Sequence, residues 1–273
     1  IVTPLKDRIE SQIITHYPKT IEVSGAITKQ EANLLPEQVQ RVDVPEICRQ
    51  LIEQIAMEAR KSEYVDQKSG VSARLTISAF ENLVSTAELR ALQNGESSTV
   101  TRIADFVGVV PSITGKIELV YEGEQEGPLT VAHRLLGQAI RSLFTMYFPD
   151  PQSFKKGRDN SESGAIGKTK HKPNPYQPVI DWFGKGNGLS VLQGDTPEVY
   201  IAKLYMVDGL YAAVKQYYPN ANEEQAGLLM EFLLHGLSEF SLISKKGVEK
   251  GGYAFADMLG SMLNMNFSDE DEA

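Results

Sequence analysis

Apolar residues recur at helical spacing along most of this chain, which limits it to a mainly α fold. In residues 44–62 they follow the order i, i+1, i+4, i+5 and i+8, so that one broad stripe of a helix is apolar. This stripe consists of Ile47, Cys48, Leu51, Ile52, Ile55, Ala56 and Ala59. Asp43 is expected to cap the helix, and Pro45 suits its first turn.

Capping patterns predict the bounds of further helices in the first half of the chain. Ser78 and Glu81 form the S-x-x-E pattern that begins a helix, and Gly95 is expected to end it. Shorter helices are predicted at residues 28–35 and 102–110.

The second half of the chain carries the same kind of signal. An amphipathic helix is predicted over residues 129–148, and later helices are predicted to begin at Thr196 and at Asn222, where Gln225 completes another capping box. A last apolar stripe is interpreted, together with Met230, as core packing. It consists of Phe255, Met258, Leu259, Met262 and Leu263.

Strand signals are few. Residues 19–23 (KTIEV) alternate like a short strand, and residues 115–123 (GKIELVYEG) are a second candidate for an extended segment. Two short candidates in a chain of this length agree with a mainly α fold.

Residues 163–169 (SGAIGKT) end like a phosphate-binding loop but do not complete the pattern. That pattern, G-x-x-x-x-G-K-[ST], requires a glycine five residues before Gly167, and this position is Glu162. Gly164 is too near and Gly157 is too distant. No apolar run that could form a buried strand precedes the segment, so the sequence predicts a polar connector here and no nucleotide site.

Composition excludes several classes of function. A net charge of −9 disfavours a nucleic-acid surface, because such surfaces depend on lysine and arginine. No stretch is apolar for the length of a membrane span, and the first residues do not have the pattern of a signal peptide. The single Cys48 and the scattered histidines offer no metal set. These features predict a cytoplasmic protein with no nucleic-acid, membrane or metal site.

Three stretches resemble a known family. They are "PLKDR…THYP", "SGVSARLTIS…ENLVSTAELRALQNGE" and "PSITGKIELVYEGE", with looser likeness through "VIDWFGKGNGLSVL", "YIAKLYMVDGL" and "EFLLHGLSEFSLISK". In these stretches the chain resembles the C-terminal half of AAA+ ATPases of the magnesium-chelatase subunit I type, which are related to the MoxR group.

The resemblance implies a division of the chain. Residues 1–27 would be the end of an AAA+ α/β core, with the arginine-finger loop and the last core strand. Residues 28–128 would form a helical lid and residues 129–149 a connecting helix. Residues 150–175, which have almost no apolar content, would be a flexible linker, and residues 176–273 a C-terminal helical domain.

The resemblance also assigns roles to two arginines. Arg8, in the "DR" pair, would be the arginine finger that projects into the ATP site of a neighbouring subunit. Arg74, in "SAR", would be the sensor-2 residue that touches the phosphates of its own subunit's ATP. A guanidinium group suits both roles because its planar fork of donors matches phosphate oxygens. Ile9 and Glu10 stand where the family commonly has "FG".

Simpler interpretations of both arginines stay open on the sequence alone. Arg8 could be a surface residue paired with Asp7 or Glu10, and such pairs contribute under about 1 kcal/mol. Arg74 could satisfy a helix end or a nearby carboxylate. His133 and His235 are predicted to be structural, and no histidine has a partner that would make an acid/base site.

The whole protein implied by the resemblance is a hexameric ATPase ring that uses ATP and Mg²⁺. It would remodel a partner complex, with a partner protein that carries a von Willebrand-type domain. The Walker A and B motifs are absent from these residues, so the chain alone is not expected to hydrolyse ATP. Two alternatives are a helical adaptor without an ATPase core and an enzyme that inserts magnesium into a porphyrin.

Overall fold

The computed structural model describes residues 8, 11, 13–154, 173–248 and 251–258. Within them the chain is mainly α, as predicted, with eleven α-helices and five short strands. The likeness of residues 1–27 to the end of an AAA+ core stays a prediction for residues 1–12, most of which lie outside the described part. The last core strand expected in this region is wrong, because residues Ile21–Glu31 form a helix.

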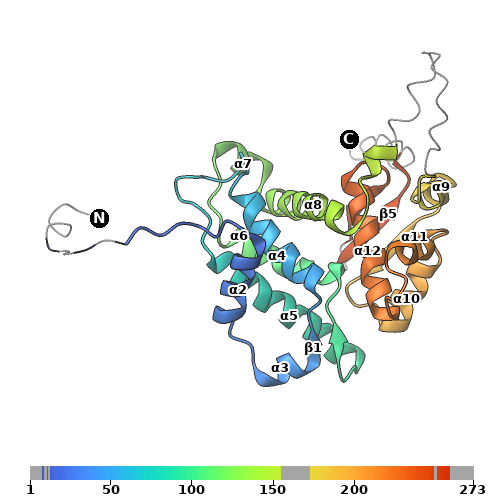
Figure 1. Cartoon of the computed structure of the whole chain (residues 1–273), viewed down its shortest axis with the longest axis horizontal. Coiled ribbons are helices and arrows are strands. Elements are labelled where there is room, and N and C mark those ends of the chain that lie inside the picture. Colours follow the sequence, from blue (N-terminus) through green and yellow to red (C-terminus); the bar gives the residue numbers. More distant parts are fainter. Residues whose placement is uncertain (1–7, 9–10, 12, 155–172, 249–250, 259–273) are drawn as a thin grey trace, which may run out of the picture.

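The first half of the chain forms a helical body in which α4 is central, packed by α2, α5 and α8 (Figure 1). Its elements are α2 (Ile21–Glu31), α3 (Pro36–Arg41), β1 (Val42–Asp43), α4 (Glu46–Ala59), α5 (Arg74–Asn94), β2 (Thr99–Val100), the 3-10 helix η1 (Ile103–Val109), α6 (Val110–Thr114), α7 (Tyr121–Glu126) and α8 (Pro128–Tyr147). β1 and β2 pair in parallel.

In the second half, helix α12 packs against α8 of the first half. The second half also carries a small antiparallel sheet in the order β3-β5-β4, with Leu189 opposite Phe255. Its elements are the 3-10 helix η2 (Pro151–Phe154), α9 (Gln177–Gly184), β3 (Leu189–Leu192), α10 (Pro197–Tyr205), α11 (Leu210–Tyr217), α12 (Glu223–Glu239), β4 (Ser244–Gly247) and β5 (Gly252–Ala256).

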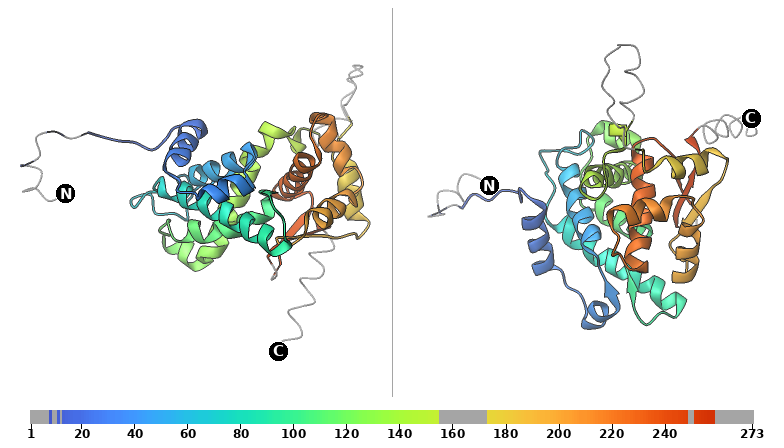
Figure 2. Two further views of the ribbon diagram at one scale, coloured as in Figure 1. Left: turned by 90° about the horizontal axis from the view of Figure 1, so that it is seen from below. Right: turned by 45° about the vertical axis from the view of Figure 1, so that its right-hand side comes forward.

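One hydrophobic core runs through both halves. Phe144 of α8 stacks on Phe232 of α12 with ring centroids 6.1 Å apart. The two helices approach closely because Gly236 has no side chain: a β-carbon there would lie 2.0 Å from the Phe144 ring. Figure 2 shows α8 running between the two halves. The described residues of 28–128 and of 176–258 therefore share a core, and the functional division of the chain stays a prediction.

The predicted strand at residues 19–23 is wrong. Thr20 is instead the N-cap of α2, and its hydroxyl oxygen accepts a hydrogen bond from the backbone N–H of Val23 at 3.3 Å. Glu22 lies in the first turn, where a negative charge favours a helix. The short alternation of apolar residues coincided with a helix start. The helix predicted over 28–35 accordingly begins earlier and ends at Glu31.

Two predicted helix starts are also wrong. Asp43 lies in β1, and Pro45 occupies the N-cap of α4 without a side-chain cap. Ser78 lies inside α5, which begins one turn earlier at Arg74, and Glu81 instead accepts a hydrogen bond from the backbone of Asn33 at 2.8 Å. Backbone pairing with Thr101 places Asp43 in a strand, and a contact with Asn33 engages the Glu81 side chain that the local pattern assigned to a cap.

Other boundaries are confirmed. Gly95 ends α5 with φ 72°. Thr196 caps α10, and Asn222 with Gln225 caps α12. The helix over 129–148 corresponds to α8.

Residues 102–110 begin with the 3-10 helix η1, and the extended segment predicted over 115–123 is limited to one isolated bridge between Leu119 and Val65 before α7 starts.

The last apolar stripe is only partly described. Phe255 is buried, but on strand β5 and not on a helix, while Met230 is buried on α12 as predicted. Leu259, Met262 and Leu263 lie outside the described residues, as do 155–172, which include the loop-like SGAIGKT segment and most of the predicted linker.

Candidate functional site

Arg74 is the first residue of α5, and its side chain is exposed. Its backbone N–H donates to the hydroxyl of Ser72 at 3.2 Å. Among the described residues, its guanidinium group makes neither an ion pair nor a hydrogen bond, so it satisfies no helix end or carboxylate of the described fold. A cation at the N-terminal end of a helix is locally unfavourable, whereas an anion is favoured there. The unpaired guanidinium group and the helix N-terminus therefore both favour binding of a negatively charged group at this end of α5.

The loop that leads into Arg74 is held by its own polar contacts. Asp66 accepts hydrogen bonds from the backbone N–H of Lys68 and from the Ser69 hydroxyl, both at 2.9 Å. These contacts lower the pKa of the Asp66 carboxyl group. Gly70 follows with φ 73°, a conformation that favours glycine.

The N-terminal segment contacts this loop through Tyr17. A β-carbon at Gly70 would lie 2.1 Å from the Tyr17 hydroxyl oxygen, so the ring fits only against a glycine. The guanidinium group of Arg60, at the end of α4, lies over the Tyr17 ring with Cζ 4.6 Å from its centroid. The Nε of Arg60 donates to the carbonyl oxygen of Val71 at 3.2 Å. Tyr17, Arg60 and Gly70 thus join the segment that carries Arg8 to the loop that carries Arg74.

Buried hydrogen bonds connect the start of α5 to α2 and α4. The Glu53 carboxylate accepts from Ser24 and, at 2.7 Å, from Thr28. The hydroxyl groups of Thr28 and Thr76 lie 2.8 Å apart, and Thr76 donates to the carbonyl oxygen of Ala73 at 3.0 Å. Burial raises the pKa of Glu53. The residue before Arg74 is therefore tied to α2 and α4.

Arg8 is exposed in the N-terminal segment, ahead of α2. Asp7 and Glu10, its possible partners, lie outside the described residues. No contact between Arg8 and Arg74 is seen in the described residues. Arg60 and Tyr17 instead link the segment of Arg8 to the loop before Arg74. Sequence reasoning missed both, although an arginine directly after the apolar stripe of α4 was a usable signal.

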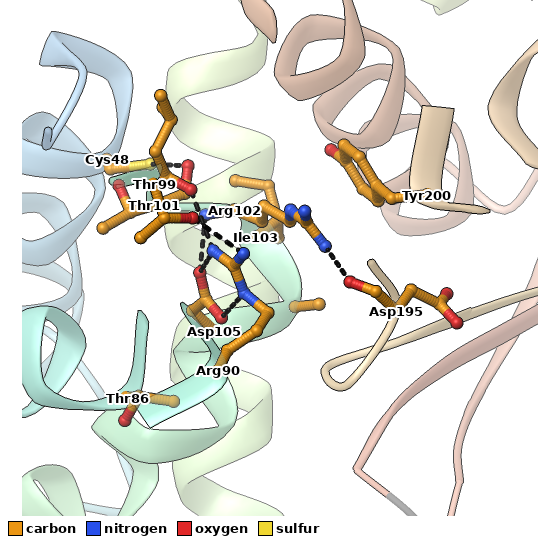
Figure 3. Close-up of polar contacts among 12 residues, drawn as sticks. Cys48, Thr86, Arg90, Thr99, Thr101, Arg102, Ile103, Asp105, Asp195 and Tyr200 are labelled. Atoms are coloured by element: carbon orange, nitrogen blue, oxygen red, sulfur yellow. Dashed lines mark hydrogen bonds and ion pairs between the residues drawn. The ribbon is translucent and has the colours of Figure 1, made fainter. Parts of the chain in front are cut away.

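A second polar cluster is buried where η1 meets α5 (Figure 3). Arg90 forms two hydrogen bonds with Asp105, from Nε to Oδ1 at 3.0 Å and from Nη2 to Oδ2 at 2.9 Å. Its Nη1 donates to Thr99 at 2.9 Å. Arg90 and Asp105 are both fully buried, which makes this an internal ion pair that holds η1 to α5.

The cluster continues into the second half of the chain through Glu231. This carboxylate of α12 accepts from the backbone N–H groups of Ile103 and Ala104 and from the Tyr200 hydroxyl, at 2.8 to 2.9 Å. Burial raises the pKa of Glu231 to about 7. The Arg102 guanidinium carbon lies 4.2 Å from the centroid of the Tyr200 ring, and Figure 3 shows the two side chains as neighbours. In the sequence, the signal for this site was Glu231 itself, a single charged residue within the apolar run of α12.

Among the described residues, the single cysteine and two of the histidines have contacts that can be described. Cys48 is buried, and burial raises the pKa of its thiol to about 12. His235 is buried against Tyr253 and Phe255, and its structural role stays a prediction. His16 hydrogen-bonds the carbonyl oxygen of Tyr17.

The described residues bear on two further features, a metal-binding group and a membrane-spanning helix. No group of three histidine, cysteine or acidic side chains that could hold a metal ion occurs within the described residues. None of the helices in the described part of the chain is long and apolar enough to cross a membrane.

No family model, no curated protein and no solved structure matches the chain.

Proposed function

We propose that this chain is the lid and C-terminal module of an AAA+ ATPase of the magnesium-chelatase subunit I or MoxR type. The observation that carries the proposal is Arg74: an exposed guanidinium group with no partner in the described fold, at the end of a helix that favours an anion. In this proposal Arg74 contacts ATP phosphates from the lid side.

The N-terminal segment supports a role for Arg8 outside its own fold. Ile13 and Ile14 are 88% and 86% exposed, although both are large and apolar. Two adjacent exposed isoleucines indicate a segment that packs against something other than the helices described here. We propose that Arg8, in this segment, acts in trans as an arginine finger.

The residues present fit the phosphate end of ATP and not the metal. Arg74 offers a planar set of donors for phosphate oxygens. The described residues contain no cluster of metal ligands, so Mg²⁺ would be held by other parts of the protein. When bound, ATP with Mg²⁺ supplies the phosphoryl group for hydrolysis. The chain's own contribution is to place positive charge beside that group, which for arginine fingers is worth about 10³- to 10⁵-fold in turnover.

The remaining parts of the proposal follow from the family. The whole protein would be a cytoplasmic hexameric ring, because a finger that acts in trans needs a neighbouring subunit. It would couple ATP hydrolysis to remodelling of a complex that includes a protein with a von Willebrand-type domain. Insertion of magnesium into a porphyrin is the family's other activity, and no contact described here favours it.

A second candidate function is a helical adaptor that binds partners without an ATPase core. One observation favours it. A groove of about 500 Å³ lies between the start of α4 and the turn from α11 to α12. Its walls include Tyr147, Tyr217 and Tyr218, and aromatic residues are common in protein-binding surfaces.

The experiment that separates these functions uses the full-length gene product in ATPase assays. Arg8→Ala subunits are mixed with subunits whose phosphate-binding loop is inactivated, and restored turnover is expected because each partner supplies what the other lacks. Arg74→Ala should lower turnover, whereas Arg134→Ala, an exposed arginine of α8, should not. A gene that encodes no phosphate-binding loop, or mixed subunits that stay inactive, would favour the adaptor.

A further inference from the structure

The guanidinium group of Arg60 is only partly satisfied. Its Nε bonds the Val71 carbonyl oxygen, but Nη1 and Nη2 are buried and have no hydrogen-bond partner among the described residues. Buried polar groups are nearly always paired, and a buried cation without an acceptor is among the costliest exceptions. Burial accordingly lowers the pKa of Arg60.

Two acidic side chains, Glu53 of α4 and Asp66 of the following loop, are engaged elsewhere. Glu53 lies on the same helix and attracts Arg60 electrostatically, but its two oxygens accept hydrogen bonds from Ser24 and Thr28. Asp66 accepts from Lys68 and Ser69 of its own loop. Neither carboxylate forms an ion pair with Arg60 in the described structure.

Tyr17 covers one side of this group, and few contacts hold Tyr17 in place. Its ring faces Arg60 at 4.6 Å, and the residue is 47% exposed. Across the described part of residues 11–19, no backbone hydrogen bond joins the segment to the helices. Figure 1 shows the segment leaving the body ahead of α2. Lifting Tyr17 would expose the Nη atoms without breaking any secondary structure.

We propose that Arg60 is the centre of a phosphate-binding site on the lid, and that Tyr17 covers this site when no anion is bound. The two Nη groups present donors in one plane, which matches the oxygens of a phosphate group. Arg74 follows Val71, the acceptor of Arg60 Nε, by three residues and offers a second unpaired guanidinium group at the same loop. A tetrahedral dianion suits two such cations better than a single carboxylate does. This site does not depend on an ATPase core.

The test uses the whole 273-residue chain with inorganic phosphate as the probe. Binding is followed by ³¹P line broadening and by the Nε–H resonance of Arg60, with acetate at equal ionic strength as the comparison anion. Tyr17→Ala should tighten phosphate binding by about two- to fivefold, the worth of one cation–π contact. Arg60→Met should abolish it. Arg60→Lys retains the positive charge but not the planar set of donors, so it should weaken phosphate binding. This variant replaces Arg60→Met in the test if the methionine variant does not fold.

Arg141 provides a matched control. Its guanidinium group also lies 4.6 Å from an aromatic ring, that of Phe240, but its Nη1 donates to the Glu239 carbonyl oxygen at 2.7 Å. Arg141→Met should leave phosphate binding unchanged. Equal binding in wild type and Arg60→Met, or equal effects of acetate and phosphate, would overturn the proposal.

ADP in place of phosphate identifies the source of the phosphate group. Stronger binding of ADP assigns the site to a nucleotide, and equal binding assigns it to free phosphate. Both results support the site if they require Arg60. Because the readout is binding by the chain alone, failure here leaves the ATPase proposal standing, and failure of subunit mixing leaves this site standing.

Discussion

The Tyr17 hydroxyl oxygen occupies the space in which a β-carbon of Gly70 would stand, 2.1 Å away. A residue near the start of the chain is thereby fitted to a loop far along the sequence. The absence of a side chain at Gly70 is what admits the tyrosine, and the backbone there is already in a conformation that favours glycine.

Gly70→Ala should release the N-terminal segment. The new methyl group collides with Tyr17, and the positive φ adds a cost of about 1 kcal/mol. Gly95→Ala is the matched control, because Gly95 has nearly the same φ, 72°, but nothing within 4 Å of its added β-carbon. Limited proteolysis of residues 11–19 should accelerate in the first variant and not in the second. Equal rates would mean that Tyr17 does not hold the segment.

Glu231 should make the protein lose stability as the pH rises. Its pKa is about 7 in the folded chain, against roughly 4.3 when unfolded. Between these values the folded state holds a proton that the unfolded state has released, so stability falls through this window, by about 4 kcal/mol in total. Urea unfolding at about pH 5 and pH 7.5 measures the difference.

Glu231→Gln should remove that difference, whereas Glu63→Gln, at an exposed position, should keep it. Burial lowers the pKa of His235, which contributes with the opposite sign, but it is common to all three proteins and cancels in the comparison. An unchanged pH slope in Glu231→Gln would contradict the assignment.

The Arg90–Asp105 pair should show strong coupling in a double-mutant cycle. Arg90→Met or Asp105→Asn alone leaves a buried polar group without its partner and should cost about 3–5 kcal/mol. The double variant should cost less than the sum. The exposed pair of Arg134 and Glu126, 4.0 Å apart, is the control and should couple by under about 1 kcal/mol. Additive effects at the buried pair would show that its members act independently.

Gly236→Ala should weaken the contact between the two halves of the chain. The added β-carbon would lie 2.0 Å from the Phe144 ring, and overpacking of this kind costs about 1–3 kcal/mol. Gly184→Ala is the comparison, since nothing lies within 4 Å of its added carbon. Thermal unfolding of both variants distinguishes them, and equal midpoints would indicate that α8 and α12 adjust freely.

The sequence predicted those features whose cause is local. Thr196 and Asn222 cap the helices that follow them, and Gly95 ends one, because each acts on the adjacent turn. Asp43 and Ser78 matched local capping patterns too, but the chain uses both positions otherwise, in a strand pair and inside a helix.

Only part of the candidate site could be predicted from the sequence, because the rest depends on contacts between distant segments. Arg8 and Arg74 were identified by family likeness, whereas Arg60 and Tyr17 acquire a role only when α4 and the N-terminal segment meet. That contact joins residues far apart in sequence, and no spacing rule encodes it. Glu231 is intermediate: its isolation in an apolar helix was visible, but its donors were not.

The stacking of Phe144 on Phe232 has a mechanical consequence. A single core runs through α4, α8 and α12. Helix α5, which carries Arg74, and the helices after residue 176 are therefore expected to move as one rigid unit. If phosphate binding as proposed tilts α5 at Arg74, this rigidity would carry the movement into α10 and α11, with the largest displacement farthest from the anion.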